Sequence, residues 1–276
     1  MYPIVYLNGA YVAKADANLN VADLAILRGY GVFDYFRYAD GQPRFLKDHT
    51  DRFFRSAASL GLQPTVDKAE LQEIVRQLID RNDSPTGGIR FVLTGGYSPD
   101  GYRPGTPNLI GMAYPFTEPA PELYERGVSV RLHDYERQLP GTKTIDYIEG
   151  IRVQEQLARE GTDYVLFVNR NDQVLESDRS NFMIVRDGTL ITPADDILLG
   201  ITRHHLLRLA KQLNIPIMEQ PVSRAELLSA DEAIICSSTK GAMPITRIDG
   251  QPVADGTPGP VTRQLMNAWP AYCATV

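Results

Sequence analysis

Two side chains in this sequence could act directly on a reacting molecule. Lys143 lies in GTKTIDYIEGI (141–151), between a strand-like run and a helical pattern, with a glycine close on either side. A desolvated lysine amine is a nucleophile, although most lysines are solvated surface residues. Glu176 supplies a carboxylate where one hairpin strand ends, and Asn181 begins another apolar strand five residues later. An exposed hairpin residue is the simpler interpretation of Glu176.

Two further segments could bind the oxygens of an anion. In LGITRHHLLRLAKQL (199–213), Thr202 precedes an amphipathic helix, and we expect it to be the N-cap. Free backbone N–H groups and the positive end of the helix dipole attract anions there, although most such helix starts only cap a helix. SSTKGAMP (237–244) ends an apolar strand with three hydroxyl groups, followed shortly by a glycine. Such a turn can hold phosphate oxygens, and an ordinary turn is the alternative.

An arginine adds a third candidate anion contact. Arg52 lies in HTDRFFRSAASLGL (49–62), where we expect it to open a helix. Phe53, Ala57 and Leu60 would then face inward. A surface arginine is the alternative interpretation of Arg52.

The four histidines do not indicate a metal site. His204 and His205 are adjacent, and neighbouring residues on a helix point about 100° apart, so they cannot both bind one ion. His49 and His133 have no acidic or cysteine neighbours at ligand spacing. The sequence therefore predicts no metal.

The first part of the chain combines a hairpin, a helix and further strands. Asn8-Gly9 between two apolar runs is the strongest short hairpin signal. In residues 67–82 apolar side chains recur at the spacing of one helical face, and Asp67 with Glu70 resembles a capping box. The predicted strands of this part are residues 5–7, 10–12, 89–96 and 108–116.

The second half of the chain alternates short strands and helices. Its predicted strands are residues 128–135, 163–169, 181–185, 190–192 and 232–236. Its predicted helices are residues 147–159, 202–213 and 258–269. Turn signals link most of the strands as hairpins, so we do not expect a doubly wound parallel sheet.

These elements predict an α/β protein of the α+β type with two domains. We expect a small α/β domain at residues 1–116 and a larger domain at residues 127–276. The segment between them, 117–126, is rich in proline and charge and resembles an interdomain linker.

Composition and charge exclude several classes of protein. Of the 276 residues, 43% are hydrophobic and 22% are charged, which is typical of a globular chain. A net charge of −6 argues against nucleic acid or an anionic membrane as a partner. No signal-peptide pattern is present, and no apolar run approaches the ~18 residues that span a bilayer. With two cysteines, Cys236 and Cys273, we expect a reduced cytoplasmic protein without disulfides.

Six motifs together resemble those of the fold-type IV pyridoxal-phosphate enzymes. They are RGYGVFDYFR (28–37), HTDRFFRSAASLGL (49–62), the segment around Lys143, ESDRSNF (176–182), GITR (200–203) and SSTK (237–240). The family includes branched-chain and D-amino-acid transaminases and aminodeoxychorismate lyase, and the motifs keep its order and spacing over nearly the whole chain. The resemblance implies a homodimer. Each subunit would have a small N-terminal domain and a larger, pseudo-barrel-like C-terminal domain, with pyridoxal 5′-phosphate between them.

The resemblance implies a role for each motif residue. Lys143 matches the lysine that forms a Schiff base with the cofactor and moves protons during the reaction. Glu176 matches the carboxylate that pairs with the pyridine nitrogen and keeps it protonated. Arg52 matches the arginine that binds the phosphate. Further cofactor contacts are implied for Tyr147, Ile201, Thr202, Ser238 and Thr239.

Several departures from the family patterns bear on the substrate. The turn at 237–240 replaces the GTAA-like turn of branched-chain enzymes and is more similar to that of D-amino-acid enzymes. The arginine and histidine that bind the substrate carboxylate in the latter group are replaced by Asp100 and Tyr102. Phe33 stands where the family has a tyrosine. Tyr147 is one position out of register with branched-chain enzymes, so ordinary packing is an equal alternative for it.

A substrate carboxylate still needs a fixed cation, because an unpaired carboxylate is costly to desolvate. Arg28 and Arg179 are the main candidates, and Arg103 is a further one. Arg179, three residues from Glu176, is either a fork for the carboxylate or an ion-pair partner that shields Glu176. Arg28 would act either in its own subunit or in the partner subunit.

The sequence therefore predicts a pyridoxal-phosphate transaminase. It would move an amino group from a D-amino acid to a 2-oxo acid such as 2-oxoglutarate, with ping-pong kinetics. The competing enzyme classes are an L-branched-chain amino acid transaminase and an aminodeoxychorismate lyase. Outside the enzymes, the candidates are a pyridoxal-phosphate-binding protein without catalysis and a protein that binds no cofactor.

Overall fold

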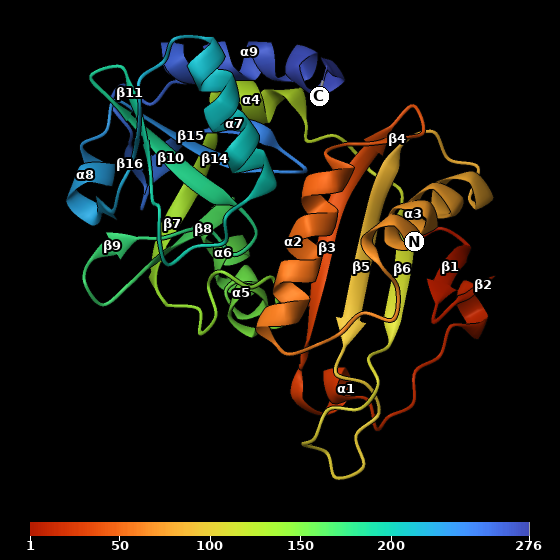
Figure 1. The fold of residues 1–276 in the computed structure, drawn as a ribbon. Coiled ribbons are helices and arrows are strands. Elements are labelled where there is room, and N and C mark those ends of the chain that lie inside the picture. Colours follow the sequence, from red (N-terminus) through yellow and green to blue (C-terminus); the bar gives the residue numbers. More distant parts are fainter. Residues whose placement is uncertain (276) are drawn as a thin grey trace. The chain divides into compact units, whose positions relative to one another are not determined.

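The chain folds into two compact units. The structure, a computed structural model, describes residues 1–275 (Figure 1). Unit 1 consists of Met1–Thr117 with Thr142–Asp146, and unit 2 consists of Glu118–Gly141 with Tyr147–Val276. The short segment around Lys143 therefore folds with unit 1, whereas the chain on both sides of it folds with unit 2.

An antiparallel sheet is the basis of unit 1. Within the described residues it has six strands, in the order β2-β1-β6-β5-β3-β4. They are β1 (Ile4–Leu7), β2 (Ala10–Ala13), β3 (Gly31–Ala39), β4 (Gln42–Pro43), β5 (Gly87–Thr94) and β6 (Leu109–Tyr114). The strands predicted for this part of the chain correspond to β1, β2, β5 and β6. Strand β3 pairs with β5 along nearly its whole length.

The predicted hairpin at Asn8-Gly9 is confirmed. Leu7 of β1 lies opposite Ala10 of β2, and the two residues between them have φ angles of 46° and 95°. Positive φ at both central positions matches the right-handed twist of the flanking strands, and glycine and asparagine reach it at low cost.

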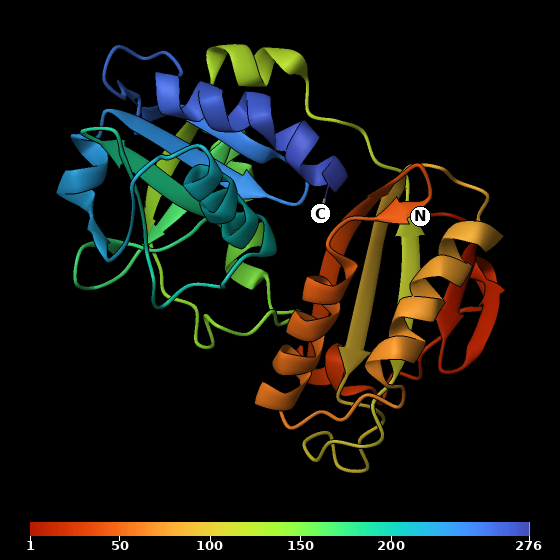
Figure 2. The same ribbon diagram turned by 45° about the horizontal axis from the view of Figure 1, so that its top comes forward.

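Helices cover one face of the sheet of unit 1. The helices of this unit are the 3₁₀ helix η1 (Lys14–Asp16), α1 (Leu24–Arg28), α2 (Leu46–Ser59) and α3 (Lys68–Arg81). Figure 2 shows α2 and α3 on the same face of the sheet. The core of the unit lies between this face and the two helices, and it includes Phe36, Phe53, Leu78 and Phe91.

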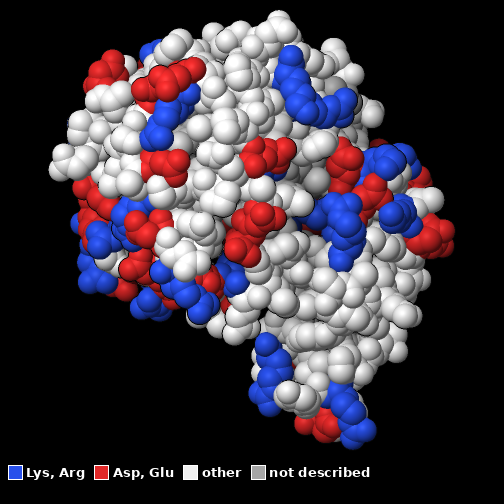
Figure 3. All heavy atoms as spheres, turned by 60° about the vertical axis from the view of Figure 1, so that its left-hand side comes forward, with Lys and Arg blue, Asp and Glu red and all other residues white. Residues whose placement is uncertain are grey.

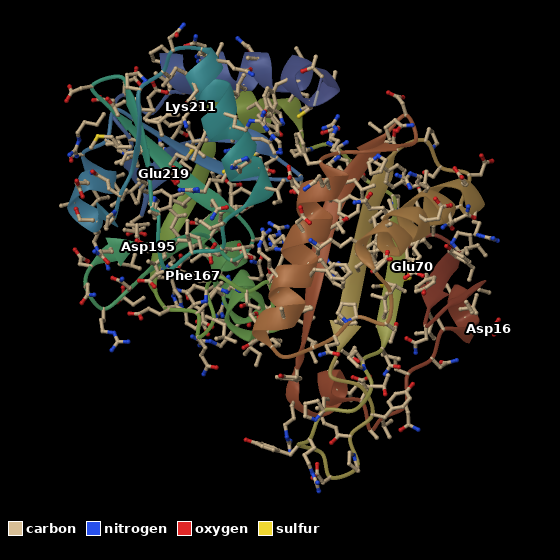
Figure 4. The ribbon with its side chains drawn as sticks, in the orientation of Figure 1. Asp16, Glu70, Phe167, Asp195, Lys211 and Glu219 are labelled. Atoms are coloured by element: carbon tan, nitrogen blue, oxygen red, sulfur yellow. The ribbon has the colours of Figure 1, made fainter. Side chains whose placement is uncertain are left out.

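The helix predicted for residues 67–82 is confirmed as α3. Asp67 accepts a hydrogen bond from the Glu70 N–H, and Glu70 (labelled in Figure 4) accepts one from the Asp67 N–H. This capping box satisfies two of the helix's otherwise unpaired N–H groups. The apolar stripe, which includes Leu71, Val75 and Leu78, is buried.

The start predicted for α2 is wrong. Arg52 does not open this helix but lies in its middle, because the helix begins at Leu46. The polar residues His49 and Thr50 belong to the helix and are buried in it. Their polarity masked the helical face, because sequence patterns treat buried polar residues as exposed. Phe53, one of the residues expected to face inward, is buried.

Unit 2 is built on a mixed sheet. Within the described residues it has ten strands, nine of them in the order β12-β11-β10-β14-β15-β7-β8-β9-β13, with β16 paired to β15. They are β7 (Val128–Asp134), β8 (Tyr164–Val168), β9 (Gln173–Val174), β10 (Asn181–Arg186), β11 (Thr189–Thr192), β12 (Ile217–Glu219), β13 (Val222–Ser223), β14 (Glu232–Ser237), β15 (Gly241–Ile248) and β16 (Gln251–Pro252). Strand β7 is parallel to β8 and β15, and β11 is parallel to β12; the other pairs are antiparallel. The expectation of an α+β fold without a doubly wound parallel sheet is confirmed.

The helices of unit 2 flank this sheet. They are α4 (Pro121–Arg126), α5 (Ile148–Arg152), α6 (Gln154–Glu160), α7 (Ile201–Gln212), α8 (Arg224–Leu228) and α9 (Pro260–Thr275). The helix predicted for 147–159 is divided at Val153 into α5 and α6. Within the segment expected to be a linker, 117–126, residues 121–126 form α4, which has a proline in its first turn. The expected domain boundaries themselves stay a prediction.

Two further features are the distribution of charged side chains on the surface and the character of the helices. On the face shown in Figure 3, acidic and basic side chains are interspersed rather than gathered by sign. Among the helices that lie within residues 1–275, none combines the length and the apolar character needed to cross a bilayer.

Candidate active site

The segment around Lys143 is clamped against the start of β3. The Phe33 N–H donates to the Lys143 carbonyl at 2.9 Å, and the Ile145 N–H donates to the Gly31 carbonyl at 3.0 Å. Thr144 forms an isolated β-bridge with Val32. The segment thus adds a short piece of extended chain to the edge of β3, which fixes the backbone that carries the lysine.

The side chain of Lys143 is half-buried beside an aromatic ring. Its Nζ lies 4.5 Å from the centroid of the Phe33 ring. Phe33 is the residue that replaces the family's tyrosine. A second cation, Arg90 of β5, has its Cζ 5.3 Å from the same ring and also lies near the rings of Tyr35 and Tyr114. Lys143 and Arg90 therefore share one aromatic neighbour.

Arg52 is held by a buried carboxylate. Its Nε and Nη2 donate to Oδ2 and Oδ1 of Asp34 in β3, at 2.8 and 2.7 Å. His49 Nδ1 lies 2.8 Å from the same Oδ1. Such a two-bond fork fixes the plane of the guanidinium, and here it leaves Nη1 for another acceptor.

Burial and the neighbouring charges act in opposite directions on the pKa values of Asp34 and His49. Burial alone would raise the pKa of Asp34, but Arg52 and His49 hold that pKa well below its usual range. Burial lowers the pKa of His49, with an opposing effect from Asp34. His49 Nδ1 donates to the carboxylate in the tautomer that carries a proton on this nitrogen. Arg52 is therefore a fixed cation with a fixed anionic partner.

Glu176 is a buried carboxylate of unit 2, between β9 and β10, and only 5% of it is exposed. Its Oε2 accepts hydrogen bonds from the Leu198 N–H at 3.1 Å and from Asn181 Nδ2 at 3.4 Å. Its Oε1 accepts one from Arg137 Nη1 at 2.9 Å. These donors hold a negative charge inside the unit and fix the plane of the carboxylate.

Arg179 does not shield Glu176, and that interpretation of it is wrong. Its Nε donates to Asp178 Oδ2 at 2.9 Å, and its side chain is 56% exposed. The ion pair with Glu176 belongs instead to Arg137, which comes from the chain after β7 and is 39 residues away in sequence. The ion-pair partner that the structure shows for Arg179 is therefore Asp178.

The N-terminus of α7 differs from the one predicted. Gly200, not Thr202, is the N-cap, and no side chain among residues 1–275 caps this end of the helix. The N-cap expected at Thr202 is wrong, because a helix capped there would begin at residue 203, whereas α7 begins two residues earlier, at Ile201. Asn181 Oδ1 lies so close to Gly200 that a Cβ at that position would collide with it. Glycine is required there, and Ile201 and Thr202 supply first-turn N–H groups.

Helix α7 is anchored to the sheet by a buried arginine. Arg203 donates to Glu219 Oε2 at 2.8 Å and to the Pro193 carbonyl at 2.7 Å, and the guanidinium is buried. Glu219 is labelled in Figure 4. This pair keeps the start of the helix in place relative to the sheet of unit 2.

The turn after β14 presents the predicted hydroxyl groups. Ser237 Oγ and Thr239 Oγ1 lie 3.0 Å apart, and Ser238 between them is half-buried. Lys240 Nζ donates to Ser180 Oγ at 3.2 Å. Burial and the positive charge of Arg179 lower the pKa of Lys240 to about 8. This turn therefore lies close to the segment that carries Glu176 and Arg179.

Three further predicted residues lie in loops or at helix ends. Tyr147 is half-buried at the N-cap position of α5. Arg28 is exposed at the end of α1, where its Nη1 donates to the Leu27 carbonyl. Arg103 pairs with Asp100 at 2.7 Å in an exposed loop. Asp100 also accepts from backbone N–H groups of this loop, so its carboxylate shapes the turn.

Within each unit the structure brings predicted residues together. In unit 1, helix α2 carries Arg52 and contacts the backbone of Lys143 one turn further along. Unit 2 groups Glu176, the start of α7 and the 237–240 turn. Among residues 1–275, no cluster of three or more His, Cys, Asp or Glu side chains could hold a metal ion.

Four residues with a place at the site were not predicted from the sequence. Asp34 and Ser56 lie within the motifs at 28–37 and 49–62, so the motifs contained a signal for them. Arg90 and Arg137 lie outside all six motifs. Only the folded sheets bring these two arginines next to Phe33 and Glu176.

The chain belongs to the class IV aminotransferases. Residues 31–248 match the model of the family described as amino-transferase class IV. The family predicted from the six motifs is thereby confirmed, and a solved structure of the same fold confirms the predicted α/β class.

Individual relatives point to two substrate classes. The D-alanine aminotransferase of Staphylococcus epidermidis is 32% identical over 274 residues, which cover 97% of each chain. A putative branched-chain-amino-acid aminotransferase of Methanocaldococcus jannaschii is 32% identical over 271 residues, which cover 95% of this chain and 93% of the relative. The crystal structure of the branched-chain amino acid aminotransferase of Escherichia coli matches with a TM-score of 0.92 at 27% identity, over 98% of this chain and 94% of that one.

Proposed function

We propose that this class IV aminotransferase is a D-amino-acid transaminase with a 2-oxo acid such as 2-oxoglutarate as amino acceptor. The observation that carries a substrate with an α-carboxylate is Arg179, whereas the D-enantiomer rests on the similarity to a D-alanine aminotransferase. Its Nε is occupied by Asp178, its side chain is exposed, and Lys240 lies nearby. A planar guanidinium with free Nη groups suits a carboxylate. The similarity to a D-alanine aminotransferase supports the same substrate class.

The residues present fit pyridoxal 5′-phosphate, which class IV aminotransferases use. The buried carboxylate of Glu176 suits a protonated ring nitrogen. The open helix N-terminus at Ile201 and Thr202, the hydroxyl groups of Ser238 and Thr239, and Nη1 of Arg52 suit the phosphate. The half-buried amine of Lys143 suits an aldehyde. Tyr147 remains a proposed contact of the phenolic oxygen.

These residues divide the work of transamination. When bound, pyridoxal 5′-phosphate supplies an aldehyde that captures the substrate amine and a ring that withdraws electrons from the substrate Cα. Lys143 Nζ removes the Cα proton, acting as the general base. Glu176 holds the proton on the ring nitrogen, which keeps the ring electron-poor. Arg179, with Arg28 of the same or the partner subunit, would bind the α-carboxylate.

An L-branched-chain amino acid transaminase is the second candidate. The branched-chain relatives from Methanocaldococcus jannaschii and Escherichia coli favour it. The 237–240 turn differs from the GTAA-like turn of that group, and this favours the D-amino-acid proposal. A homodimer and a cytoplasmic location belong to the same proposal.

Half-reactions with paired enantiomers test the proposal. The holoenzyme is mixed with D- or L-alanine, glutamate or leucine, and the loss of its visible absorbance is followed without an acceptor. We expect faster bleaching with the D-enantiomer of each pair and recovery on addition of 2-oxoglutarate. Faster bleaching with L-leucine would establish the branched-chain alternative. Absence of bleaching with every amino acid would contradict transamination altogether.

A further inference from the structure

One face of α2 forms hydrogen bonds with β3 and with the segment around Lys143. Arg52, Ser56 and Ser59 are spaced four and three residues apart, which places them in one row on the helix. Arg52 bonds to Asp34 of β3. Ser56 Oγ accepts the backbone N–H of Lys143 at 3.2 Å. Ser59 Oγ lies 2.8 Å from Thr142 Oγ1.

The contact between Ser56 and Lys143 is shielded from water. Ser56 is 2% exposed, and Thr142, which precedes the lysine, is 6% exposed. A hydrogen bond in such a place is costly to remove, because the donor loses its partner without regaining water. The contact therefore restrains the lysine backbone more than an exposed hydrogen bond would.

The Lys143 residue is held from two directions. Strand β3 binds its carbonyl through the Phe33 N–H, and helix α2 binds its N–H through Ser56. With both backbone polar groups held, the direction of the Cα–Cβ bond is fixed. The amine can then move only through the rotations of its own side chain, which shortens the search for a reactive geometry.

We propose that Ser56 is a positioning residue for Lys143. Its hydroxyl fixes the lysine backbone on the same helix that carries Arg52, so α2 sets the spacing between the amine and the phosphate-binding guanidinium. The inference rests on the proposed function for the roles of Lys143 and Arg52. It adds a residue that touches neither cofactor nor substrate and acts through the backbone of Lys143.

Two variants of α2 separate this role from general stability. Ser56→Ala removes the acceptor of the Lys143 N–H. Thr50→Val is the matched control, because Thr50 is also 2% exposed and its hydroxyl donates to the Leu46 carbonyl of its own helix. Both variants lose one buried hydroxyl group of α2, but only one of them loses contact with Lys143.

The first measurement is hydrogen exchange of the Lys143 amide in the cofactor-free protein. Loss of a buried hydrogen bond, about 1–3 kcal/mol, corresponds to a rate change of about 5- to 150-fold. We expect exchange faster by that factor in Ser56→Ala and unchanged in Thr50→Val. Equal exchange rates in Ser56→Ala and the wild type would overturn the proposal.

The second measurement is the rate of the half-reaction with saturating amino acid. In Ser56→Ala we expect a rate constant lowered about tenfold, with KM and cofactor affinity nearly unchanged, because neither ligand touches Ser56. An unchanged rate constant, or a fall matched by Thr50→Val, would overturn the positioning role. If Ser56→Ala does not fold, Ser56→Cys keeps the volume with a weaker acceptor and should show a smaller change in the same direction.

The experiments distinguish failure of the proposed function from failure of the positioning role of Ser56. If the wild-type holoenzyme transaminates no amino acid, the proposed function fails, whereas the exchange result still reports the Ser56 contact. If the wild type is active and Ser56→Ala matches it in both measurements, only the positioning role fails.

Discussion

Arg52 in unit 1 and Glu176 in unit 2 are each held by an ion pair, but the signs of the two charges are exchanged between the units. In unit 1 the group proposed to meet the ligand is a cation, Arg52, and the buried anion Asp34 lies behind it. In unit 2 the group proposed to meet the ligand is an anion, Glu176, and the cation Arg137 lies behind it. If the proposed contacts are right, each unit holds one charged group for a ligand charge of the opposite sign.

The two regions also differ in how deeply the supporting charge is buried. The side chain of Asp34 is 1% exposed, and it is enclosed with His49 and Arg52. The side chain of Arg137 is 18% exposed, so water still reaches part of it. A buried charge that loses its partner is the costlier of the two, because no solvent replaces the lost contact. Loss of the supporting charge should therefore affect the fold more in unit 1 than in unit 2.

The largest expected effect on activity comes from replacing Lys143. Lys143→Ala should fold, because the change removes only a half-buried side chain and keeps the backbone contacts with β3 and α2. It should lose all transamination and all cofactor that borohydride can trap. Mass spectrometry after borohydride treatment and a coupled turnover assay check both points. Substantial turnover in this variant would show that another residue moves the proton.

Removal of the supporting charge in unit 1 should destabilise the fold. Asp34→Asn leaves Arg52 buried without its anion, which typically costs about 3–5 kcal/mol in the free energy of unfolding at pH 7. The pKa of Asp34 is depressed in the folded state, so its stabilising contribution is full above the ordinary value of 3.8 and is lost as the pH falls below it. The difference between variant and wild type should therefore shrink in acid. Urea denaturation at neutral and acidic pH measures it.

Asp51→Asn is the control for this comparison. Asp51 pairs with Lys47 and Lys68 on the exposed side of α2, where solvent weakens the interaction. Its effect on the free energy of unfolding should be much smaller than that of Asp34→Asn. Equal effects of the two variants would mean that the buried pair does not hold the fold of unit 1.

A smaller effect is expected at the exposed ion pair of unit 2. If Arg179 binds the α-carboxylate, Arg179→Ala should lower kcat/KM about 10- to 150-fold for both amino acid and 2-oxo acid, the loss of a charge-assisted contact of ~1.5–3 kcal/mol. Arg179→Lys should restore little, because an ammonium group cannot form the same two-bond contact. Primary amines without a carboxylate serve as the control and should react equally with all three enzymes. Equal losses for amines and amino acids would assign Arg179 a structural role instead.

Features that depend on neighbouring residues were predictable from the sequence. The Asn8-Gly9 turn requires positive φ angles that these residue types favour, and the capping box of Asp67 and Glu70 lies within one helical turn. Helix α7 was also predicted, but its N-cap was misplaced. The residue that packs against the true N-cap, Gly200, is Asn181 of strand β10, which no local pattern around the helix reveals. Local patterns therefore predicted these helices and strands, but not the contacts from distant residues that fix where they begin.

The partners of the site residues were not predictable in the same way. Asp34 precedes Arg52 by 18 residues, and Arg137 precedes Glu176 by 39. No periodicity links positions so far apart, because only the folded sheets bring them together. The motifs predicted which residues meet a ligand, whereas the structure was needed to show what holds Arg52, Glu176 and the backbone of Lys143.

The most direct test of the opposite charge orders compares two ligands. Dissociation constants of pyridoxal 5′-phosphate and of pyridoxal, which lacks the phosphate, are measured for the wild type, Arg52→Met and Glu176→Gln. If Arg52 binds the phosphate and Glu176 the ring nitrogen, Arg52→Met should reduce the preference for the phosphorylated ligand about 10- to 150-fold. Glu176→Gln should weaken both ligands and leave that preference nearly unchanged. A preference that survives in Arg52→Met, or falls equally in both variants, would contradict the account.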